Sequence, residues 1–352
     1  MPNPVTVLFP AEWQPQSAVQ LTWPHEETDW RAMLEETTAC FVAIAMAIAK
    51  REKLLIVCKN ATQVIQQLGN IDIGQIIFRE MPTNDTWARD HGAISVFIDG
   101  KPSVCDFTFN GWGLKFAANF DNQIVRNLFQ SGVFSQHAAY LNSQHVVLEG
   151  GSIESDGQGC IMTTSRCLLS ANRNDFLSKD EIELLLKQMF GANRILWLNH
   201  GYLAGDDTDC HIDMLARFCD AQTIAYVHCD DAEDEHFSEL QEMERELQAF
   251  RTTVGEPYRL LPLPMADCVV YNAERLPASY ANFLIINDAV LVPTYRSPRK
   301  DAFALQQLQR AFPDREIIGI DCLPLIRQHG SLHCVSMQYP ENFIVENSED
   351  QT

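Results

Sequence analysis

Apolar residues along the chain fall into short runs that alternate with longer helix-like stretches. Residues 33–53 have the composition of a helix, with little glycine or proline, and the apolar run at 54–58 predicts a short strand after it. Residues 61–68 predict another helix, and residues 76–81 predict the next strand. Strands and helices therefore alternate in the first part of the chain.

Two stretches have the residue pattern and the turn residues of β-hairpins. Residues 93–109 turn at Asp99-Gly100, and residues 283–295 turn at Asn287-Asp288. Antiparallel pairs of this kind argue against a purely parallel sheet. The pattern thus predicts an α/β or α+β chain.

Three further helices are predicted in the second half. The first spans residues 178–191, where Ser178 and Glu181 have the spacing of a capping box. The others span residues 234–253, which carry many charges, and residues 301–312.

The length and composition of the chain limit the number of domains and the class of protein that we expect. The 352 residues are 46% hydrophobic, which is ample for a large core. No low-complexity linker divides the chain, so we expect one domain over residues 1–345 and a frayed acidic tail over residues 346–352. We also expect a cytoplasmic protein without a membrane span, because the sequence has no run of 18 apolar residues and no secretory signal pattern. Homo-oligomerisation stays open.

The net charge and the cysteine spacing limit which binding partners and which kinds of cysteine site the sequence favours. A net charge of −21 argues against nucleic acid and favours small cations. The eleven cysteines include no CxxC pair, which argues against a zinc module and a disulfide scaffold. Most of them are therefore expected to be reduced thiols in the core.

Four polar clusters interrupt the apolar pattern. They occupy residues 84–92, 148–159, 205–213 and 329–340, at predicted strand ends or turns. Functional side chains are often carried on such segments of a rigid scaffold.

The cluster at residues 205–213 is rich in acids. If the segment is extended, Asp207, Asp209, His211 and Asp213 point to one face and need a positive partner. That partner is either a metal ion, with His211 and acids as zinc ligands, or a cationic substrate. The pattern does not fit an EF-hand, and an aspartate-rich turn that caps a following helix is the purely structural alternative.

Cys334 is either one more core thiol or a nucleophile. A nucleophilic cysteine needs a histidine near it in space. His333 would point to the opposite face if the segment is a strand, so His211 is the better candidate.

Together these residues suit chemistry on a guanidinium group. Carboxylates such as Asp90, Glu149, Asp209 and Asp213 can hold its nitrogens, and a thiolate can then add to its carbon. A histidine can protonate the departing ammonia, and water can release a ureido product. The carboxylates should raise the cysteine pKa above its usual ~8.5 until a cation binds.

Four segments carry a resemblance to a known family: "NDTWARDHG", "LEGGSIESDG", "GDDTDCHID" and "HGSLHCVSMQYP". In this order they resemble the agmatine deiminase and bacterial peptidylarginine deiminase family of the guanidine-modifying superfamily. The resemblance implies a five-bladed α/β-propeller, the pentein fold, with pseudo-fivefold ββαβ repeats. It implies neither a cofactor nor a metal ion.

The resemblance also implies roles for single residues. Cys334 matches the nucleophile and His211 the general acid/base, while Asp90 and Asp213 match the carboxylates that hold the guanidinium. Glu149 matches a glutamate near that histidine. Trp87 matches an aromatic beside the substrate, and Asn282 a substrate-binding asparagine near the nucleophile. Asp209 matches none of the clamp positions.

Two departures from the family pattern bear on the site. Cys210 stands where the family has glycine, so a different local turn is expected and Cys210 becomes a rival nucleophile. Gly330-Ser331-Leu332 replaces a run of glycines, which bears on the identity of the substrate.

The implied reaction is hydrolysis of agmatine to N-carbamoylputrescine and ammonia, a step of polyamine and putrescine biosynthesis. The alternatives are deimination of peptidyl or free arginine, a metal-dependent hydrolase, and a non-catalytic guanidine-binding protein. Free arginine would require a basic residue for its carboxylate, and the matched segments offer only Arg89.

Overall fold

The computed structural model describes residues 5–345, so the predicted acidic tail lies outside the described residues. Five sheets repeat one connection, in which two antiparallel strands are followed by a helix and a third strand parallel to the second. The fold is therefore mixed α/β, and the repetition is visible in the order of the elements although the sequence shows no close repeat.

The first two units contain the elements between residues 7 and 147 and the last strand of the described chain. The elements of the first are β19 (Ser336–Pro340), β2 (Gln16–Thr22), α1 (Leu34–Ala49) and β3 (Lys53–Cys58), with β4 (Ile76–Glu80) added at its edge. The elements of the second are β5 (Ile94–Ile98), β6 (Lys101–Thr108), α5 (Ile124–Gln130) and β7 (Ala139–Val147), with β1 (Val7–Leu8) on β5.

The other three units follow in chain order. The third consists of β8 (Ile153–Ser155), β9 (Cys160–Thr164), α7 (Lys179–Phe190) and β10 (Arg194–Leu198). The fourth consists of β11 (Ala216–Asp220), β12 (Thr223–His228), α8 (Phe237–Ala249) and β13 (Arg259–Pro264). The fifth consists of β16 (Leu284–Ile286), β17 (Ala289–Thr294), α9 (Pro298–Ala311) and β18 (Glu316–Asp321).

Short elements complete the description. They are η1 (Asp29–Met33), α2 (Ala61–Leu68), η2 (Ile73–Gln75), α3 (Ala88–His91), α4 (Gly111–Leu114), η3 (Asp121–Gln123), η4 (Gly150–Ser152), α6 (Ser165–Leu168), η5 (Ile212–Met214), the hairpin β14 (Val270–Tyr271) and β15 (Glu274–Arg275), and α10 (Leu323–Ile326).

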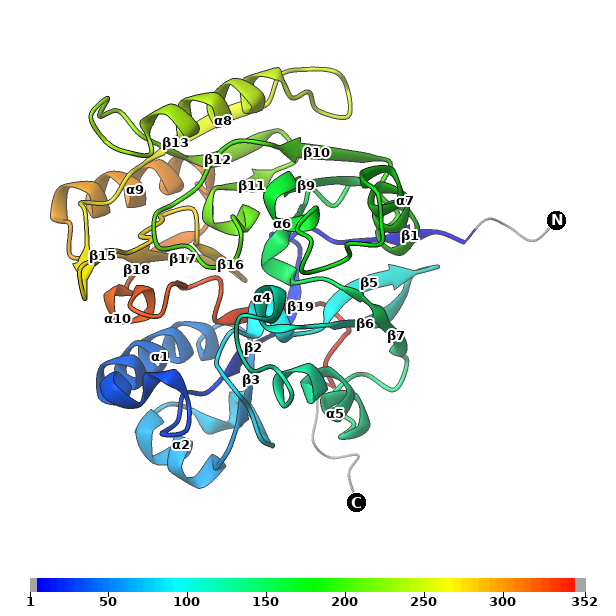
Figure 1. The fold of residues 1–352 in the computed structure, drawn as a ribbon. Helices are drawn as coiled ribbons and strands as arrows, with labels where there is room; N and C mark the ends of the chain where they lie inside the picture. The colour runs from blue at the N-terminus through cyan, green and yellow to red at the C-terminus, as the bar shows by residue number, and fades with distance from the viewer. Residues whose placement is uncertain (1–4, 346–352) are drawn as a thin grey trace.

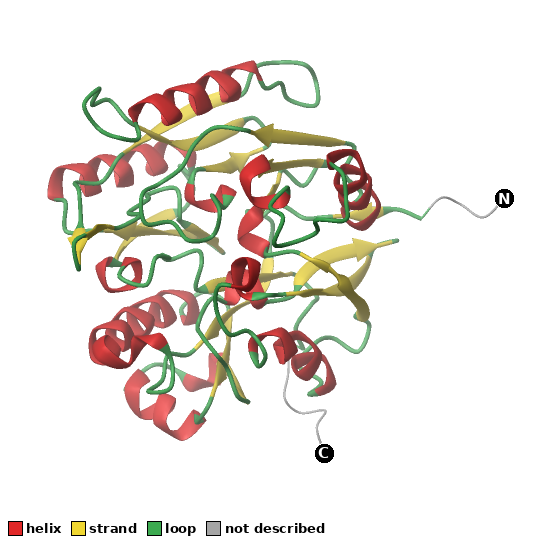
Figure 2. Cartoon of the chain, viewed as in Figure 1, coloured by secondary structure: helices red, strands yellow, loops and turns green. Residues whose placement is uncertain are grey.

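The helices of the five units, α1, α5, α7, α8 and α9, lie toward the outside of the molecule, and the strands lie inside them (Figures 1 and 2). The middle strand of each unit is buried along nearly its whole length, as in β9 and β17. Strands covered on both faces read as continuous apolar runs rather than as alternating ones. This is why the short apolar runs of the sequence proved to be strands.

Both predicted hairpins are confirmed. Ile94 to Ile98 pairs antiparallel with Lys101 to Cys105, and Asp99 and Gly100 both have positive φ, as a tight two-residue turn requires. β16 and β17 pair around Asn287 and Asp288. The capping box of Ser178 and Glu181 is also present at the start of α7.

Three predicted extents were wrong. The helix predicted over residues 33–53 ends at Ala49, because β3 begins at Lys53. The helix predicted over residues 234–253 is confined to Phe237–Ala249, because Phe250 adopts an extended backbone and Arg251 forms a bridge to Pro257. The strand expected around Cys334 begins only at Ser336, and residues 332–335 form a turn.

One helical stretch, Asp29–Ala49, is long and apolar enough by length and composition to cross a membrane. Its apolar side chains Phe41, Ile44 and Ile48 are fully buried in the protein core, and the helix packs against β3 and α10. This burial is typical of a core helix in a globular protein.

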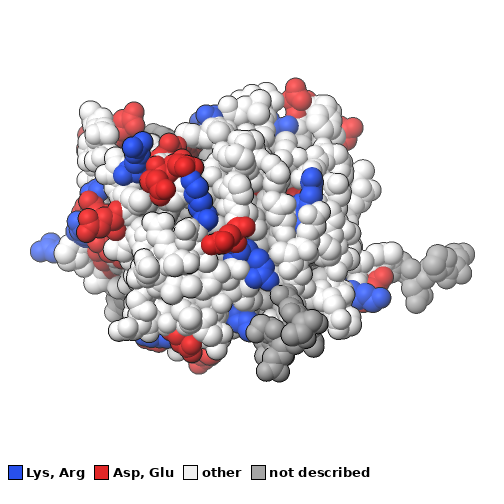
Figure 3. Space-filling view, turned by 90° about the horizontal axis from the view of Figure 1, so that it is seen from below, with Lys and Arg blue, Asp and Glu red and all other residues white. Residues whose placement is uncertain are grey.

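Charged side chains are mixed rather than segregated on the face shown in Figure 3. Lysines and arginines lie beside aspartates and glutamates there.

Candidate active site

The candidate site forms where five short segments meet, each just before the first strand of a unit. The backbone N–H of Gly151 in η4 donates to Asp90 Oδ1 in α3, at 3.1 Å. Asn282, before β16, donates from Nδ2 to the carbonyl of Asp213 in η5, at 3.3 Å. The N–H of Arg89 donates to the carbonyl of Cys334, before β19, at 3.1 Å. The repeated topology thus brings together residues that are up to 244 positions apart, from Asp90 to Cys334.

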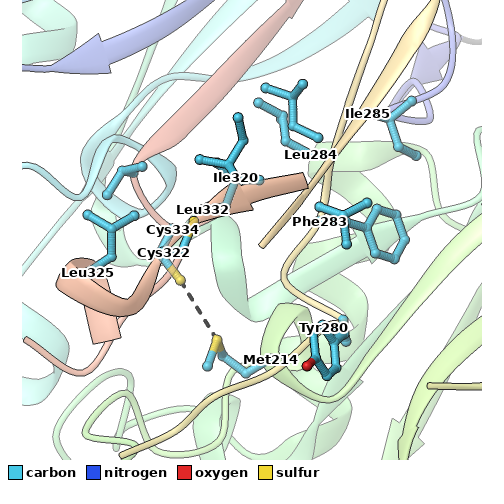
Figure 4. Close-up of a cluster of buried hydrophobic side chains, with 14 of the residues drawn as sticks. Met214, Tyr280, Phe283, Leu284, Ile285, Ile320, Cys322, Leu325, Leu332 and Cys334 are labelled. Carbon is cyan, nitrogen blue, oxygen red and sulfur yellow. Dashed lines mark hydrogen bonds between the residues drawn. The ribbon is translucent and has the colours of Figure 1, made fainter. Parts of the chain in front are cut away.

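Cys334 lies in the turn before β19 and is buried. Its Sγ lies 3.4 Å from Asn282 Oδ1 and 3.8 Å from Asp213 Oδ2. It also lies 3.9 Å from Met214 Sδ, the contact that the dashed line marks in Figure 4. Burial raises the pKa of this thiol well above its usual value, and Asp213 and Asp90 raise it further. The thiol is therefore protonated at neutral pH when no cation is bound.

Asp90 and Asp213 are both buried but differ in their partners. Asp90 Oδ2 accepts a hydrogen bond from Trp112 Nε1 at 2.8 Å, and burial raises the pKa of Asp90 to about 6. Burial is the largest single influence on the pKa of Asp213 and tends to raise it, but the hydrogen bond and charge of His333, together with the charges of His211 and Arg217, outweigh burial and lower the pKa. Asp213 Oδ1 has no hydrogen-bond partner among the described residues, so it is free to accept from a ligand.

His211 lies next to Asp90. Its Nδ1 lies 3.6 Å from Asp90 Oδ1. Burial is the largest single influence on the pKa of His211 and lowers it, but Asp90, Cys167 and Glu149 together outweigh burial and leave the pKa well above the usual value. A Cβ on Gly151 would come within 2.7 Å of His211 Nδ1 and 2.8 Å of Asp90 Oδ1. Any larger residue at position 151 would push His211 and Asp90 out of these positions.

Glu149 is buried and already paired. Both of its carboxylate oxygens accept from Arg173 Nε at 3.0 Å, and Arg173 Nη1 donates to Asp209 Oδ2 at 2.6 Å. Asp209 also pairs with Lys115 at 2.7 Å. The structure thus places Glu149 near His211 and turns Asp209 toward two cations of the protein.

The segment 205–213 is not extended, so the argument that its alternate residues share one face was wrong. Asp209 and Cys210 have φ of 66° and 65°, in the left-handed region that favours glycine. Cys210 is buried, and burial raises its pKa to about 12. Its N–H donates to Asp206 Oδ2 at 2.7 Å, and it does not line the pocket over Cys334.

A pocket with an empty volume of about 390 Å³, counted to its open mouth, leads to Cys334 and Asp90. Trp87, Trp112 and Phe116 form aromatic walls. Three further carboxylates line it, from Asp29, Asp85 and Asp207. Its lining residues include no lysine or arginine; His329 is the one basic side chain among them.

Gly330 fits the pocket wall closely. A Cβ on this residue would lie 2.1 Å from Cζ3 of Trp87, so the backbone packs directly on the indole. Gly330 is therefore required by Trp87, while Ser331 Oγ is bonded to Tyr295 at 2.8 Å, behind the pocket.

Two groups of side chains have the donor types and spacing of metal ligands: Glu149, Cys167 and His211, and Glu12, Glu154 and His333. The carboxylate of Glu149 is bound by Arg173, and those of Glu12 and Glu154 by Arg217. Because an arginine already balances these carboxylates, both groups fit a metal ion poorly.

The sequence interpretation missed Trp112, Arg173 and Glu12. Trp112 stands in "FNGWG", where a large aromatic between glycines was a usable signal. Arg173 and Glu12 have no local signal, because each acts on a residue distant in sequence. His333 was discounted on the assumption of a strand, but in the turn its Nδ1 reaches Asp213 Oδ2 at 2.8 Å.

A buried thiol, a histidine and paired carboxylates at the meeting point of five αβ units form the kind of site found in cysteine-dependent enzymes. Residues 8–340 match the family described as Porphyromonas-type peptidyl-arginine deiminase. The chain belongs to this family.

Individual relatives agree with this assignment. An agmatine deiminase of Pseudomonas aeruginosa is 33% identical, covering 94% of this chain and 95% of its own. A structure of a putative arginine deiminase from Porphyromonas gingivalis is 55% identical with a TM-score of 0.94, covering 97% of this chain and all of its own. A substrate-bound structure of a C. jejuni agmatine deiminase is 37% identical with a TM-score of 0.88, covering 96% of this chain and 97% of its own.

Proposed function

We propose that this chain is an agmatine deiminase, a hydrolase that converts agmatine to N-carbamoylputrescine and ammonia through a covalent amidino-cysteine. The observation that carries the proposal is the pocket over Cys334, which is lined by four aspartates and by no lysine or arginine. Agmatine carries two positive charges and no carboxylate, so the four aspartates of the pocket can attract it. Several relatives carry the same name.

The geometry supports a two-stage mechanism. Asp90 and Asp213 Oδ1 would accept from the guanidinium, and the cation would lower the pKa of Cys334 so that the thiol gives its proton to solvent, where the released ammonia takes it up. The thiolate adds to the guanidinium carbon. His211, which holds a proton because of Asp90, gives it to the departing nitrogen, and ammonia leaves as the C–N bond breaks.

The second stage returns the enzyme to its starting state. Neutral His211 takes a proton from water as the water oxygen adds to the carbon of the amidino thioether. The C–S bond then breaks as the new hydroxyl becomes the carbonyl of the ureido product, and the proton of that hydroxyl passes to the leaving sulfur and restores the thiol of Cys334. No oxidant or reductant is needed.

Free arginine is the less suitable substrate. Its carboxylate would meet Asp29, Asp85 and Asp207 in the pocket without a lysine or arginine to bind it. Arg89 does not serve, because it lines a different cavity and its Nη2 lies 3.7 Å from Glu12.

Wider features of the protein belong to the same proposal. We infer that the five units close into one five-bladed α/β-propeller domain over residues 1–345, which the pairing of β19 with β2 supports. The proposed product points to polyamine biosynthesis in the cytoplasm.

Ammonia release tests the function. We expect turnover of agmatine that resists EDTA, is abolished by iodoacetamide and is lost in Cys334→Ala, while Cys210→Ala, the matched cysteine control, keeps it. Preference for arginine or a blocked arginine peptide would overturn the substrate. Activity that is lost in Cys210→Ala and kept in Cys334→Ala would move the nucleophile. Ammonia release from none of these guanidines would overturn the activity and favour a guanidine-binding protein.

A further inference from the structure

His333 lies between two buried carboxylates. Its Nδ1 lies 2.8 Å from Asp213 Oδ2, and its Nε2 lies 2.7 Å from Glu12 Oε2. All three side chains are at most 8% exposed, so water competes little for these hydrogen bonds. The ring therefore fixes how the carboxylate of Asp213 is turned.

The backbone of His333 is held as firmly as its ring. Its N–H donates to Asn282 Oδ1 at 2.8 Å. The same Oδ1 lies 3.4 Å from Cys334 Sγ. One residue thus links the turn that carries the thiol to the aspartate that faces the guanidinium.

The two oxygens of Asp213 have different surroundings as a result. His333 occupies Oδ2, whereas Oδ1 is buried without a hydrogen-bond partner in the described part of the chain. A buried carboxylate oxygen without a donor is costly unless a ligand supplies one. Oδ2 lies 3.8 Å from Cys334 Sγ but is already bound by the imidazole, so Oδ1 is the oxygen of Asp213 that keeps its hydrogen-bonding capacity for a ligand.

Charges around the ring fix the number of protons there. Two ionised carboxylates only accept hydrogen bonds, so the set of Asp213, His333 and Glu12 must hold one proton beyond neutral imidazole. Burial, Arg217 and Arg89 lower the pKa of His333, while Glu12 and Asp213 raise it. Glu12 is itself held by Arg217, which also pairs with Glu154.

We propose that His333, anchored on Glu12, is a positioning residue that turns Asp213 so that Oδ1 receives the substrate guanidinium beside Cys334. This inference rests on the proposed deiminase function. His333 does not touch the substrate; it acts through Asp213.

Two substitutions separate the two ring contacts. In His333→Asn the amide nitrogen takes the place of Nδ1 and can still donate to Asp213. In His333→Gln the amide nitrogen takes the place of Nε2 and reaches only Glu12. We expect His333→Asn to keep kcat/KM for agmatine within about 5-fold and His333→Gln to lose about 10- to 100-fold, mostly as a higher KM.

The pH profile supplies a readout that a merely structural role would not change. The bond from His333 lowers the pKa of Asp213, so its loss in His333→Gln should raise that pKa toward the value of about 6 of Asp90; two carboxylates would then gain protons in the same range, and the acid limb of kcat/KM should begin at higher pH. His333→Asn should keep the limb in place. His200→Gln, which alters a half-exposed histidine paired with Glu246, is the matched control and should resemble the wild type.

The outcomes are distinct. Equal kcat/KM and equal acid limbs in the two His333 variants, with wild-type turnover intact, would overturn this inference alone. A wild-type enzyme that releases no ammonia from agmatine would instead overturn the proposed function, and the inference with it.

Discussion

Two aspartates that face the same site have pKa values shifted in opposite directions. Burial dominates for Asp90 and raises its pKa to about 6, whereas the bond from His333 lowers that of Asp213. One carboxylate is therefore ionised across the physiological range, and the other gains a proton in mildly acidic solution.

The shift of Asp90 predicts the acid limb of activity. Above pH 6 Asp90 is ionised and can bind the guanidinium; below it, protonation removes the charge. We expect kcat/KM for agmatine to fall about tenfold per pH unit below about pH 6, measured by ammonia release. Circular dichroism at each pH controls for unfolding, and a constant kcat/KM down to pH 5 in folded enzyme would contradict the assignment.

At the scale of an element, the segment Gly111–Leu114, which positions Trp112 beside Asp90, has a strained backbone. All four of its residues have positive φ, including Trp112 at 55° and Leu114 at 68°. Such backbone costs of order 1–3 kcal/mol per non-glycine residue and persists where the surroundings enforce it. Here it directs the indole N–H of Trp112 to Asp90.

Trp112→Phe should remove that donor. Because the bond lowers the pKa of Asp90, its loss should move the acid limb to higher pH and reduce kcat/KM about tenfold. The same kinetics on Trp197→Phe, whose indole binds Glu183 outside the site, provide the control. An unmoved acid limb in Trp112→Phe would disprove the role of the indole.

A second prediction at this scale concerns Gly151 in the short element η4. In Gly151→Ala the added methyl would displace His211 and Asp90, so kcat should fall at least a hundredfold with little change in thermal unfolding. Gly74→Ala, where the new Cβ meets only the flexible side chain of Asp72 at 3.1 Å, is the control and should stay active. Wild-type kcat in Gly151→Ala would show that the close contact is not needed.

At the scale of the whole molecule, the two ends of the described chain share one sheet. β19 pairs with β2, from Ser336 opposite Leu21 onward, and Cys334 lies two residues before β19. The nucleophile is therefore held by a strand that depends on the opposite end of the sequence.

Tyr339→Ala should weaken the packing that holds β19 against β2. Tyr339 is fully buried, its hydroxyl donates to Gln20 Oε1 at 2.6 Å, and its ring packs against Phe134. We expect a loss of about 3–5 kcal/mol in the free energy of unfolding, measured in urea. Phe176→Ala, at a 68% exposed position, should change it little; equal losses in both variants would show that β19 makes no special contribution.

Local patterns were sufficient for many elements. The helix at 61–68, both hairpin turns and the capping box at Ser178 were predicted because each is specified by neighbouring residues. The start of β19 and the end of α8 were not, since tertiary contacts decide where such elements stop.

The sequence by itself determined the mixed α/β class and the types of side chain in the site, because apolar periodicity and residue chemistry are local. Only the tertiary structure decided how those side chains meet. It turned His333 toward Asp213, bound Glu149 to Arg173 and brought Trp112 to Asp90. These contacts join residues 22 to 120 positions apart, and the packing of repeated units, rather than any pattern along the chain, sets their geometry.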